Sequence, residues 1–168
     1  MEAKNHKSAL VYLFEYIKDG KEINESLLKR LHEILMNGIL DNTGSYRYHP
    51  MRIVGSQTIT TNYLKVPELI QNLFLEMHTS QDDTLTKVSI FHSKFEIIHP
   101  FPDGNGRVGR LLMNAMLIKE NIIPVIIDKK KKNVYYNCLD KAFTDGKYDH
   151  MINFIADSVR DTYEEFGV

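Results

Sequence analysis

The chain has 168 residues, of which 43% are hydrophobic, and a formal net charge of −1. This length suffices for one domain with a proper core, and the balanced charge gives no long-range attraction to nucleic acid. Cys138 is the only cysteine, which excludes an intrachain disulfide and a cysteine-based metal site. We find neither a signal-peptide pattern nor an apolar run of membrane-spanning length. We therefore expect a cytoplasmic protein without a membrane or nucleic-acid partner.

Most of the chain has the apolar spacing that is typical of amphipathic helices. We expect the first helix over residues 5–18 and a second from about Asn24, which caps it, to Gly38, which ends it. Residues 44–63 are extended in character and centred on Gly55 and Ser56, which favours a hairpin. A third helix is expected over residues 67–78, because proline suits the first helical turn.

Two more helices are expected on either side of residues 99–110, since the apolar spacing stops before that stretch and resumes at Leu111. Residues 122–127 are short, apolar and extended in character. Helices over residues 133–143 and 148–166 complete the chain. The sequence thus predicts a single, mainly α-helical domain over residues 1–168.

Residues 99–110 read His-Pro-Phe-Pro-Asp-Gly-Asn-Gly-Arg-Val-Gly-Arg and gather several chemically active groups in twelve positions. Pro100 disfavours helical geometry at His99, so we expect a helix to end there. The next helix follows directly, and its first turn offers unpaired N–H groups and the positive end of a dipole. The stretch is therefore predicted to be a tight loop that opens onto a helix N-terminus.

Such a loop suits a nucleotide triphosphate. Gly104 and Gly106 let the backbone form a concave set of N–H donors for phosphate oxygens. Arg107 and Arg110 add forked, permanently charged donors. Taken one at a time, these residues have ordinary explanations as a turn and a solvated helix face; their combination at this spacing favours the phosphate site.

Two further side chains point to catalysis. Asp103 is placed to hold Mg²⁺ against bound phosphates, because Mg²⁺ prefers one or two carboxylates together with substrate oxygens. His99 has the intrinsic pKa of a general base near neutral pH. A lone histidine at a helix end is usually a cap or a core residue, so this role depends on its neighbours.

The whole stretch resembles the signature of Fic-domain proteins, H-x-F-x-[D/E]-G-N-G-R-x-x-R. Every fixed position is met, namely by His99, Phe101, Asp103, Gly104, Asn105, Gly106, Arg107 and Arg110. The resemblance extends from about residue 3 to residue 166. It implies a Fic fold, that is, a helical bundle with a short β-hairpin flap at about residues 44–63 over the active site.

Most Fic proteins with the full signature transfer AMP from ATP to a hydroxyl of a target protein. By resemblance, His99 would deprotonate the Ser, Thr or Tyr hydroxyl and Asp103 would hold Mg²⁺. The backbone of residues 104–107 with Arg107 would grip the α- and β-phosphates, Arg110 would orient the γ-phosphate, and Phe101 would anchor the loop. A phosphorylating branch carries Ala and Lys in place of the two glycines; Gly104 and Gly106 instead match the nucleotide transferases.

The resemblance also assigns residues outside the loop. The flap would dock a segment of the target protein as an added strand. Its members Val54, Gly55, Ser56 and Gln57 would border the nucleotide; without the motif we would expect only a surface hairpin. Tyr135 and Tyr136 would lie near the adenine and its sugar, although a tyrosine pair on a helix is otherwise usually core packing. Phe143 occupies the position at which some relatives carry an asparagine.

Fic transferases are usually restrained by an inhibitory helix that bears [S/T]-x-x-x-E-[G/N]. No glutamate of this chain has Ser or Thr four residues earlier. Three explanations stay open: a separate antitoxin-like inhibitory protein, an inhibitory helix removed from the chain, or control by another route such as oligomerisation.

Other functions stay open as alternatives. The chain could remove AMP from modified proteins, although that reaction uses the inhibitory glutamate to position water. It could also transfer another nucleotidyl or phosphate-linked group. A non-catalytic module that binds a nucleotide or a partner belongs to a different class, and the presence of both His99 and Asp103 disfavours it.

Overall fold

The computed structural model describes residues 1–53 and 59–167, and most of them are helical. The mainly α-helical fold predicted from the sequence is confirmed. In the part of the chain that is described, no helix has both the length and the apolar character needed to cross a membrane. The helices are α1 (Glu2–Lys18), α2 (Glu25–Met36), α3 (Val66–Thr79), α4 (Thr84–Ile98), α5 (Asn105–Lys119), α6 (Lys132–Asp145) and α7 (Asp149–Phe166), with 3₁₀ turns η1 (Tyr63–Lys65) and η2 (Lys129–Lys131).

The sequence signals at helix ends act as expected. The Asn24 side chain caps α2 by accepting a hydrogen bond from the Leu27 N–H at 3.0 Å, and Pro67 lies in the first turn of α3. Helix α1 begins at Glu2, three residues before the predicted start. Asn5 is buried. Its side chain donates to the Leu35 and Asn37 carbonyls, and these bonds tie α1 to the end of α2.

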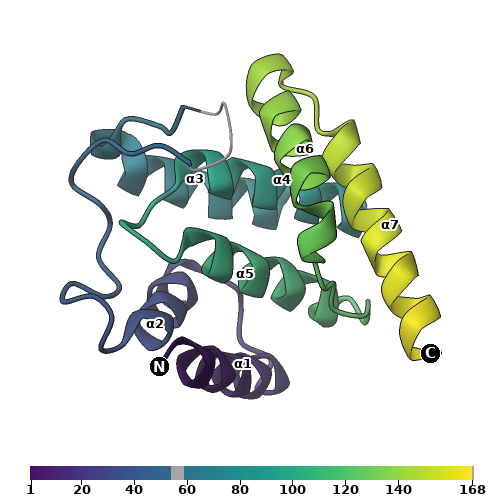
Figure 1. Cartoon of the computed structure of the whole chain (residues 1–168), viewed down its shortest axis with the longest axis horizontal. Coiled ribbons are helices and arrows are strands. Elements are labelled where there is room, and N and C mark those ends of the chain that lie inside the picture. Colours follow the sequence, from purple (N-terminus) through teal and green to yellow (C-terminus); the bar gives the residue numbers. More distant parts are fainter. Residues whose placement is uncertain (54–58, 168) are drawn as a thin grey trace.

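Helix α4 lies in the middle of the bundle (Figure 1) and packs against α3, α5, α6 and α7. On the other side of α5, helices α1 and α2 pack against each other and against α5. The largest fully buried side chains include Phe95 of α4, Phe101 of the following loop, and Leu112 and Leu117 of α5. The loop between α4 and α5 is thus attached to the main core through Phe101.

The described residues on either side of the gap, 44–53 and 59–63, run past the end of α4 and form no strand. An isolated antiparallel bridge joins Arg52 and Ile59. These positions are equally distant in sequence from Gly55 and Ser56, where the predicted hairpin is centred. That centre falls in residues 54–58, outside the described residues, so the hairpin flap stays a prediction.

Residues 122–127 were expected to be extended, and the structure gives them no regular element. The Asn114 side chain of α5 holds them in place. Its amide accepts from the Val125 N–H at 2.8 Å and donates to the Val125 carbonyl at 3.0 Å. The segment therefore pairs with one side chain in place of a neighbouring strand.

Candidate functional site

The loop between α4 and α5 begins at His99, as Pro100 predicts. His99 caps the C-terminus of α4 in the left-handed region, with φ 50° and ψ 63°, and its N–H donates to the Phe95 carbonyl at 2.9 Å. A left-handed conformation is uncommon for a residue other than glycine and persists only where the surroundings hold it. The backbone turns sharply at the proposed catalytic base.

Asn105 closes this loop. Its side-chain oxygen accepts from the Phe101 N–H at 2.8 Å and its amide nitrogen donates to the Phe101 carbonyl at 2.7 Å. The Phe101 ring itself is fully buried, which is the position required of an anchor for the loop. Because the Asn105 side chain is engaged in this way, its backbone N–H is the group that it offers to a nucleotide.

The second half of the motif is helical. Gly104 is the N-cap of α5 at φ 81°, so α5 begins at Asn105, six residues before the predicted resumption at Leu111. A Cβ at Gly104 would lie 2.9 Å from the Met36 sulfur, so glycine is required both by the backbone angle and by the space. The N–H groups of this first turn have no partner within the helix and suit an anion.

The His99 ring has the arrangement of a general base. Its Nδ1 lies 3.3 Å from the Glu96 carbonyl. A carbonyl oxygen only accepts, so Nδ1 carries the ring proton in this bond and Nε2 keeps its lone pair. Burial lowers the pKa of His99, and the positive charge of Arg47 acts in the same direction. The imidazole is therefore neutral and ready to accept a proton at neutral pH.

Asp103 presents a carboxylate at the mouth of the loop. Its side chain is 60% exposed, and one oxygen lies 3.6 Å from the Arg107 guanidinium. Among the described residues no group of three or more His, Cys, Asp or Glu side chains could hold a metal ion alone. One accessible carboxylate beside a phosphate-binding helix end fits Mg²⁺, which takes its other ligands from substrate phosphates and water.

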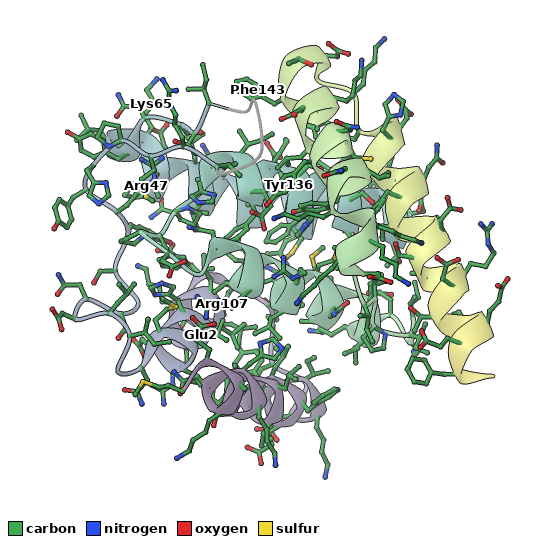
Figure 2. All side chains as sticks on the ribbon, viewed as in Figure 1. Glu2, Arg47, Lys65, Arg107, Tyr136 and Phe143 are labelled. Atoms are coloured by element: carbon green, nitrogen blue, oxygen red, sulfur yellow. The ribbon has the colours of Figure 1, made fainter. Side chains whose placement is uncertain are left out.

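Arg107 lies on the side of the loop that faces α1 and α2. Figure 2 shows it beside Glu2, whose carboxylate is 3.7 Å from one guanidinium nitrogen. That nitrogen is buried and makes no hydrogen bond within the described structure. The guanidinium thus has one donor that is buried and without a hydrogen-bond partner.

Arg110 lies across the first turn of α5, and a Cβ at Gly106 would come within 3.1 Å of its guanidinium. Beneath it is Glu96, which is buried and has a carboxylate oxygen without a hydrogen-bond partner among the described residues. Burial raises the pKa of Glu96 to about 7, and the positive charge of Arg110 opposes that rise. Arg110 is therefore close to a carboxyl that is only partly ionised at neutral pH.

The two tyrosines of α6 have different environments. The Tyr135 hydroxyl lies 3.0 Å from the buried His92 Nε2, and burial raises its pKa well above the ordinary value. Tyr136 is only half-buried, with its ring 5.5 Å from that of Tyr135. Of the pair, Tyr136 is the more exposed and therefore has ring surface left for a ligand; Figure 2 shows its place on α6. The other predicted nucleotide neighbours, Val54, Gly55, Ser56 and Gln57, lie outside the described residues.

His32 of α2 also supports the loop, and the sequence analysis missed it. Its Nδ1 accepts from the Gly44 N–H at 2.7 Å, so the proton is on Nε2, which donates to the Asp103 carbonyl at 3.1 Å. The ring stacks on Phe101 at a centroid distance of 3.8 Å. A signal existed: His32 falls on the apolar face of α2, four residues from both Leu28 and Met36.

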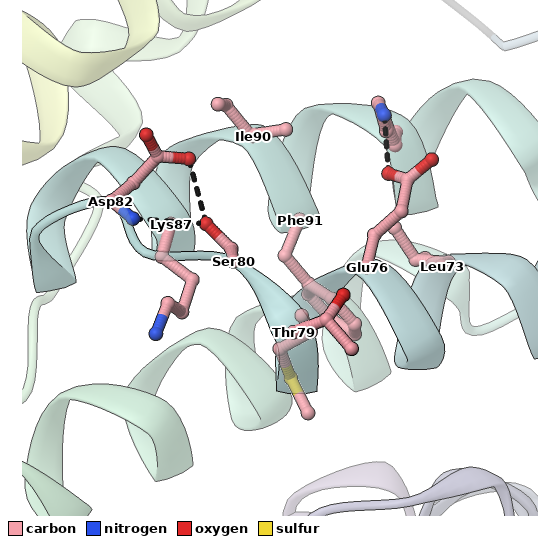
Figure 3. A pocket seen from close by; sticks show the side chains of 10 residues that line it. Leu73, Glu76, Thr79, Ser80, Asp82, Lys87, Ile90 and Phe91 are labelled. Atoms are coloured by element: carbon pink, nitrogen blue, oxygen red, sulfur yellow. Dashed lines mark hydrogen bonds and ion pairs between the residues drawn. The ribbon is translucent and has the colours of Figure 1, made fainter.

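Several hollows lie outside the loop, among them two that border α4. One, of about 300 Å³, lies between α3 and α4 and is lined by Ser80, Asp82, Glu76 and Lys94 among others (Figure 3). No motif residue lines it. A second, of about 440 Å³, is lined by Thr61, Ile98 and Phe143 and adjoins the end of α4 that leads into the loop. The groups suited to phosphate chemistry are therefore concentrated at the loop.

Comparisons with known proteins show which family this chain is similar to. The Fic/DOC family profile matches residues 22–117. A probable protein adenylyltransferase of Aquifex aeolicus is 36% identical over 121 residues, which is 71% of this chain and 37% of the relative. A protein adenylyltransferase Fic of Drosophila grimshawi is 34% identical over 157 residues, covering 86% of this chain and 32% of the relative. This chain thus spans about a third of the length of both relatives.

Solved structures show the same fold. A Fic-1 fragment from C. elegans superposes with a TM-score of 0.86 at 22% identity, covering 98% of this chain and 50% of that one. A Fic family protein from Desulfovibrio desulfuricans superposes with a TM-score of 0.76 at 27% identity, covering 95% of this chain and 52% of that one. From its sequence match and its fold, the chain belongs to the Fic/DOC family.

Proposed function

We propose that this chain transfers AMP from ATP to a Ser, Thr or Tyr hydroxyl of a target protein. The observation that carries the proposal is the contact of His99 Nδ1 with the Glu96 carbonyl at 3.3 Å, which leaves Nε2 to accept a proton, beside the open N-terminus of α5. Relatives named protein adenylyltransferase support transferase activity in general. The specific donor, acceptor and residue roles are our proposal.

The reaction would proceed by in-line displacement. His99 Nε2 takes the proton of the target hydroxyl, and the hydroxyl oxygen forms a bond to the α-phosphorus of ATP. The bond between that phosphorus and the bridging oxygen breaks, and pyrophosphate leaves. The lowered pKa of His99 keeps the base unprotonated at neutral pH. Most of the rate gain would come from positioning and charge neutralisation.

Different groups of the chain would bind different phosphates of the triphosphate. The first-turn N–H groups of α5 from Asn105 to Arg107 and the Arg107 guanidinium would bind the α- and β-phosphates. Arg110 would bind the γ-phosphate. Asp103 would hold Mg²⁺, which when bound neutralises charge on the phosphate oxygens. Tyr136 would contact the base or sugar with its half-buried ring, and Tyr135 would support it from the core.

The target segment would approach along residues 44–63. The described ends of this segment are bonded to the end of α4: the Arg47 N–H donates to the Pro100 carbonyl at 2.8 Å and the Thr61 N–H to the Ile97 carbonyl at 3.3 Å. A peptide paired with this segment would lie beside His99. Pairing through backbone hydrogen bonds tolerates different target sequences.

The position of a radioactive label tests the proposal. Purified chain is incubated with Mg²⁺, a panel of candidate proteins, and ATP labelled at either the α- or the γ-phosphorus. Nucleotidyl transfer puts the α-label on protein, whereas kinase chemistry puts the γ-label there. We expect only the α-label, lost with His99→Ala. Transfer of the γ-label, or α-labelling that survives His99→Ala, would contradict the proposal.

A further inference from the structure

The Arg47 side chain is buried, being 2% exposed, at the end of the helix that carries the proposed base (Figure 2). Its Nε donates to the His99 carbonyl at 2.7 Å, and its Nη2 donates to the Ile98 carbonyl at 3.2 Å. Carbonyls at a helix C-terminus have no partner within the helix. Arg47 therefore acts as the cap of α4 from a part of the chain about 50 residues earlier.

The same guanidinium reaches both ends of the segment 44–63. Its Nη1 donates to the His49 carbonyl at 2.8 Å, in residues 44–53, which form the outgoing stem of the segment. Its Nη2 also donates to the Thr61 carbonyl, on the returning stem. Four carbonyls from three stretches of chain thus meet on one rigid, planar group. A lysine ammonium at the end of a flexible stem could not span them in the same way.

Arg47 is a buried cation, and burial lowers its pKa. No ion pair joins Arg47 to a carboxylate in the described part of the chain. Its neighbours are carbonyl oxygens at the negative end of the α4 dipole. Arg47 in turn lowers the pKa of His99, together with burial, while the Glu96 carbonyl and the Asp103 carboxylate act in the opposite direction.

We propose that Arg47 is a positioning residue. It fixes the left-handed His99 backbone and the two stems of the segment 44–63 (residues 44–53 and 59–63) at constant positions relative to one another. A docked target segment and the base then keep a constant distance from each other. The catalytic part of this proposal rests on the function proposed above, whereas the positioning of His99 does not. His99 adopts its φ of 50° in a place where Arg47 holds its carbonyl.

Kinetics of folded variants test the catalytic part. We compare Arg47→Gln and Arg47→Lys with Arg160→Gln, which alters an exposed arginine of α7 that forms an ion pair with Asp157. All are assayed for AMP transfer well below their unfolding temperatures. For Arg47→Gln we expect kcat to fall about 10- to 100-fold, with KM for ATP within about threefold of the wild type. Arg47→Lys should recover part of kcat, and Arg160→Gln should match the wild type.

The pH profile separates positioning from a purely structural role. Without the Arg47 charge, the acid limb of kcat/KM should move to higher pH, because the pKa of His99 rises. Arg47→Lys, which keeps the charge, should leave the limb nearer its original position. If Arg47 only stabilised the fold, unfolding temperatures would drop but kcat and the acid limb of the folded enzyme would not change. That result would overturn the proposal.

NMR decides the positioning part even if the chain transfers no AMP. The His99 ring of Arg47→Gln should titrate at higher pH than that of the wild type. In the wild-type chain the Arg47 Nε–H should exchange with solvent at least about 100-fold more slowly than that of Arg160, because it is buried and bonded. This second measurement needs no variant to fold. Equal exchange rates, or an unchanged His99 titration, would overturn the assignment.

Discussion

The loop that begins at His99 and the segment 44–63 are held together in different ways. The loop is closed within itself by the Asn105 side chain, which brackets Phe101, and His32 of α2 adds a bond to the Asp103 carbonyl. The segment has one isolated bridge in its described part and is fastened at its two stems, chiefly by Arg47. The half proposed to bind phosphate is thus closed by a bracket within the loop itself, whereas the described part of the segment 44–63 is held by contacts of its two ends with α4 and, through Gly44 and His32, with α2.

Matched asparagine variants test this contrast most strongly. Asn105→Ala removes two hydrogen bonds from a buried loop and leaves both Phe101 backbone groups unpaired, so we expect a loss of about 2–4 kcal/mol in the free energy of unfolding. Asn62→Ala removes an exposed cap that accepts only from the Leu64 N–H, and should cost about 0.5–1 kcal/mol. Urea unfolding measures both. Equal losses would remove the difference between the two regions.

The pH dependence of stability tests the core beneath Arg110. The pKa of Glu96 is raised from 4.5 to about 7 in the folded chain. The native state therefore binds more protons than the unfolded state between these values, and this contribution to stability is lost as the pH rises through about 7. Glu96→Gln removes the effect. As the pH rises from 5 to 8, the free energy of unfolding of the variant should increase relative to that of the wild type, by up to about 3 kcal/mol.

Unfolding of both chains across this pH range gives the comparison directly. The buried His92, whose pKa is about 4, contributes a slope of opposite sign to wild type and variant alike. The difference between the two chains therefore reports Glu96. A constant difference across the range would show that Glu96 titrates normally.

Arg110→Ala tests the proposed division of phosphate binding. Losing a charged donor to the γ-phosphate should raise the dissociation constant for ATP about 10-fold or more. The affinity for AMP, which lacks that phosphate, should change by less than about twofold. Calorimetry of ATP and AMP binding measures both, with Arg160→Ala as the surface control. An equal loss for ATP and AMP would assign Arg110 to the α-phosphate or to the fold.

Replacing Glu2 should have the smallest effect of these changes, and it should act on the affinity for ATP. Its side chain is 70% exposed and 3.7 Å from the Arg107 guanidinium, so solvent screens the pair. Glu2→Gln should change the affinity for ATP by less than about threefold, in the direction of tighter binding. A gain above about tenfold would mean that this carboxylate competes with phosphate for Arg107.

The sequence predicts the parts of the site that depend on neighbours along the chain. Pro100 ends α4 at His99, Asn24 and Pro67 mark helix starts, and the motif spacing gives the order of the chemical groups. The start of α5 was predicted six residues late, because Gly104 caps the helix in a left-handed conformation that apolar spacing does not reveal.

The supporting residues could not be predicted in the same way. His32 and Arg47 act on carbonyls 71 and 52 residues away, so their roles exist only once α2, α4 and the segment 44–63 are packed together. Glu96 and His32 left a trace as polar residues on apolar helix faces. That pattern shows that a polar group is buried, but it does not show which atom it meets.

The most direct test of the central claim is the intact mass of the purified chain after incubation with ATP and Mg²⁺, beside a His99→Ala control. Replacing the general base should slow transfer about 10²- to 10⁴-fold while ATP binding is kept. We predict that the wild-type chain, or a target protein added to it, gains the mass of one AMP, and that the variant shows no gain in the same time. An equal gain in both would contradict the account, because the base would then lie elsewhere.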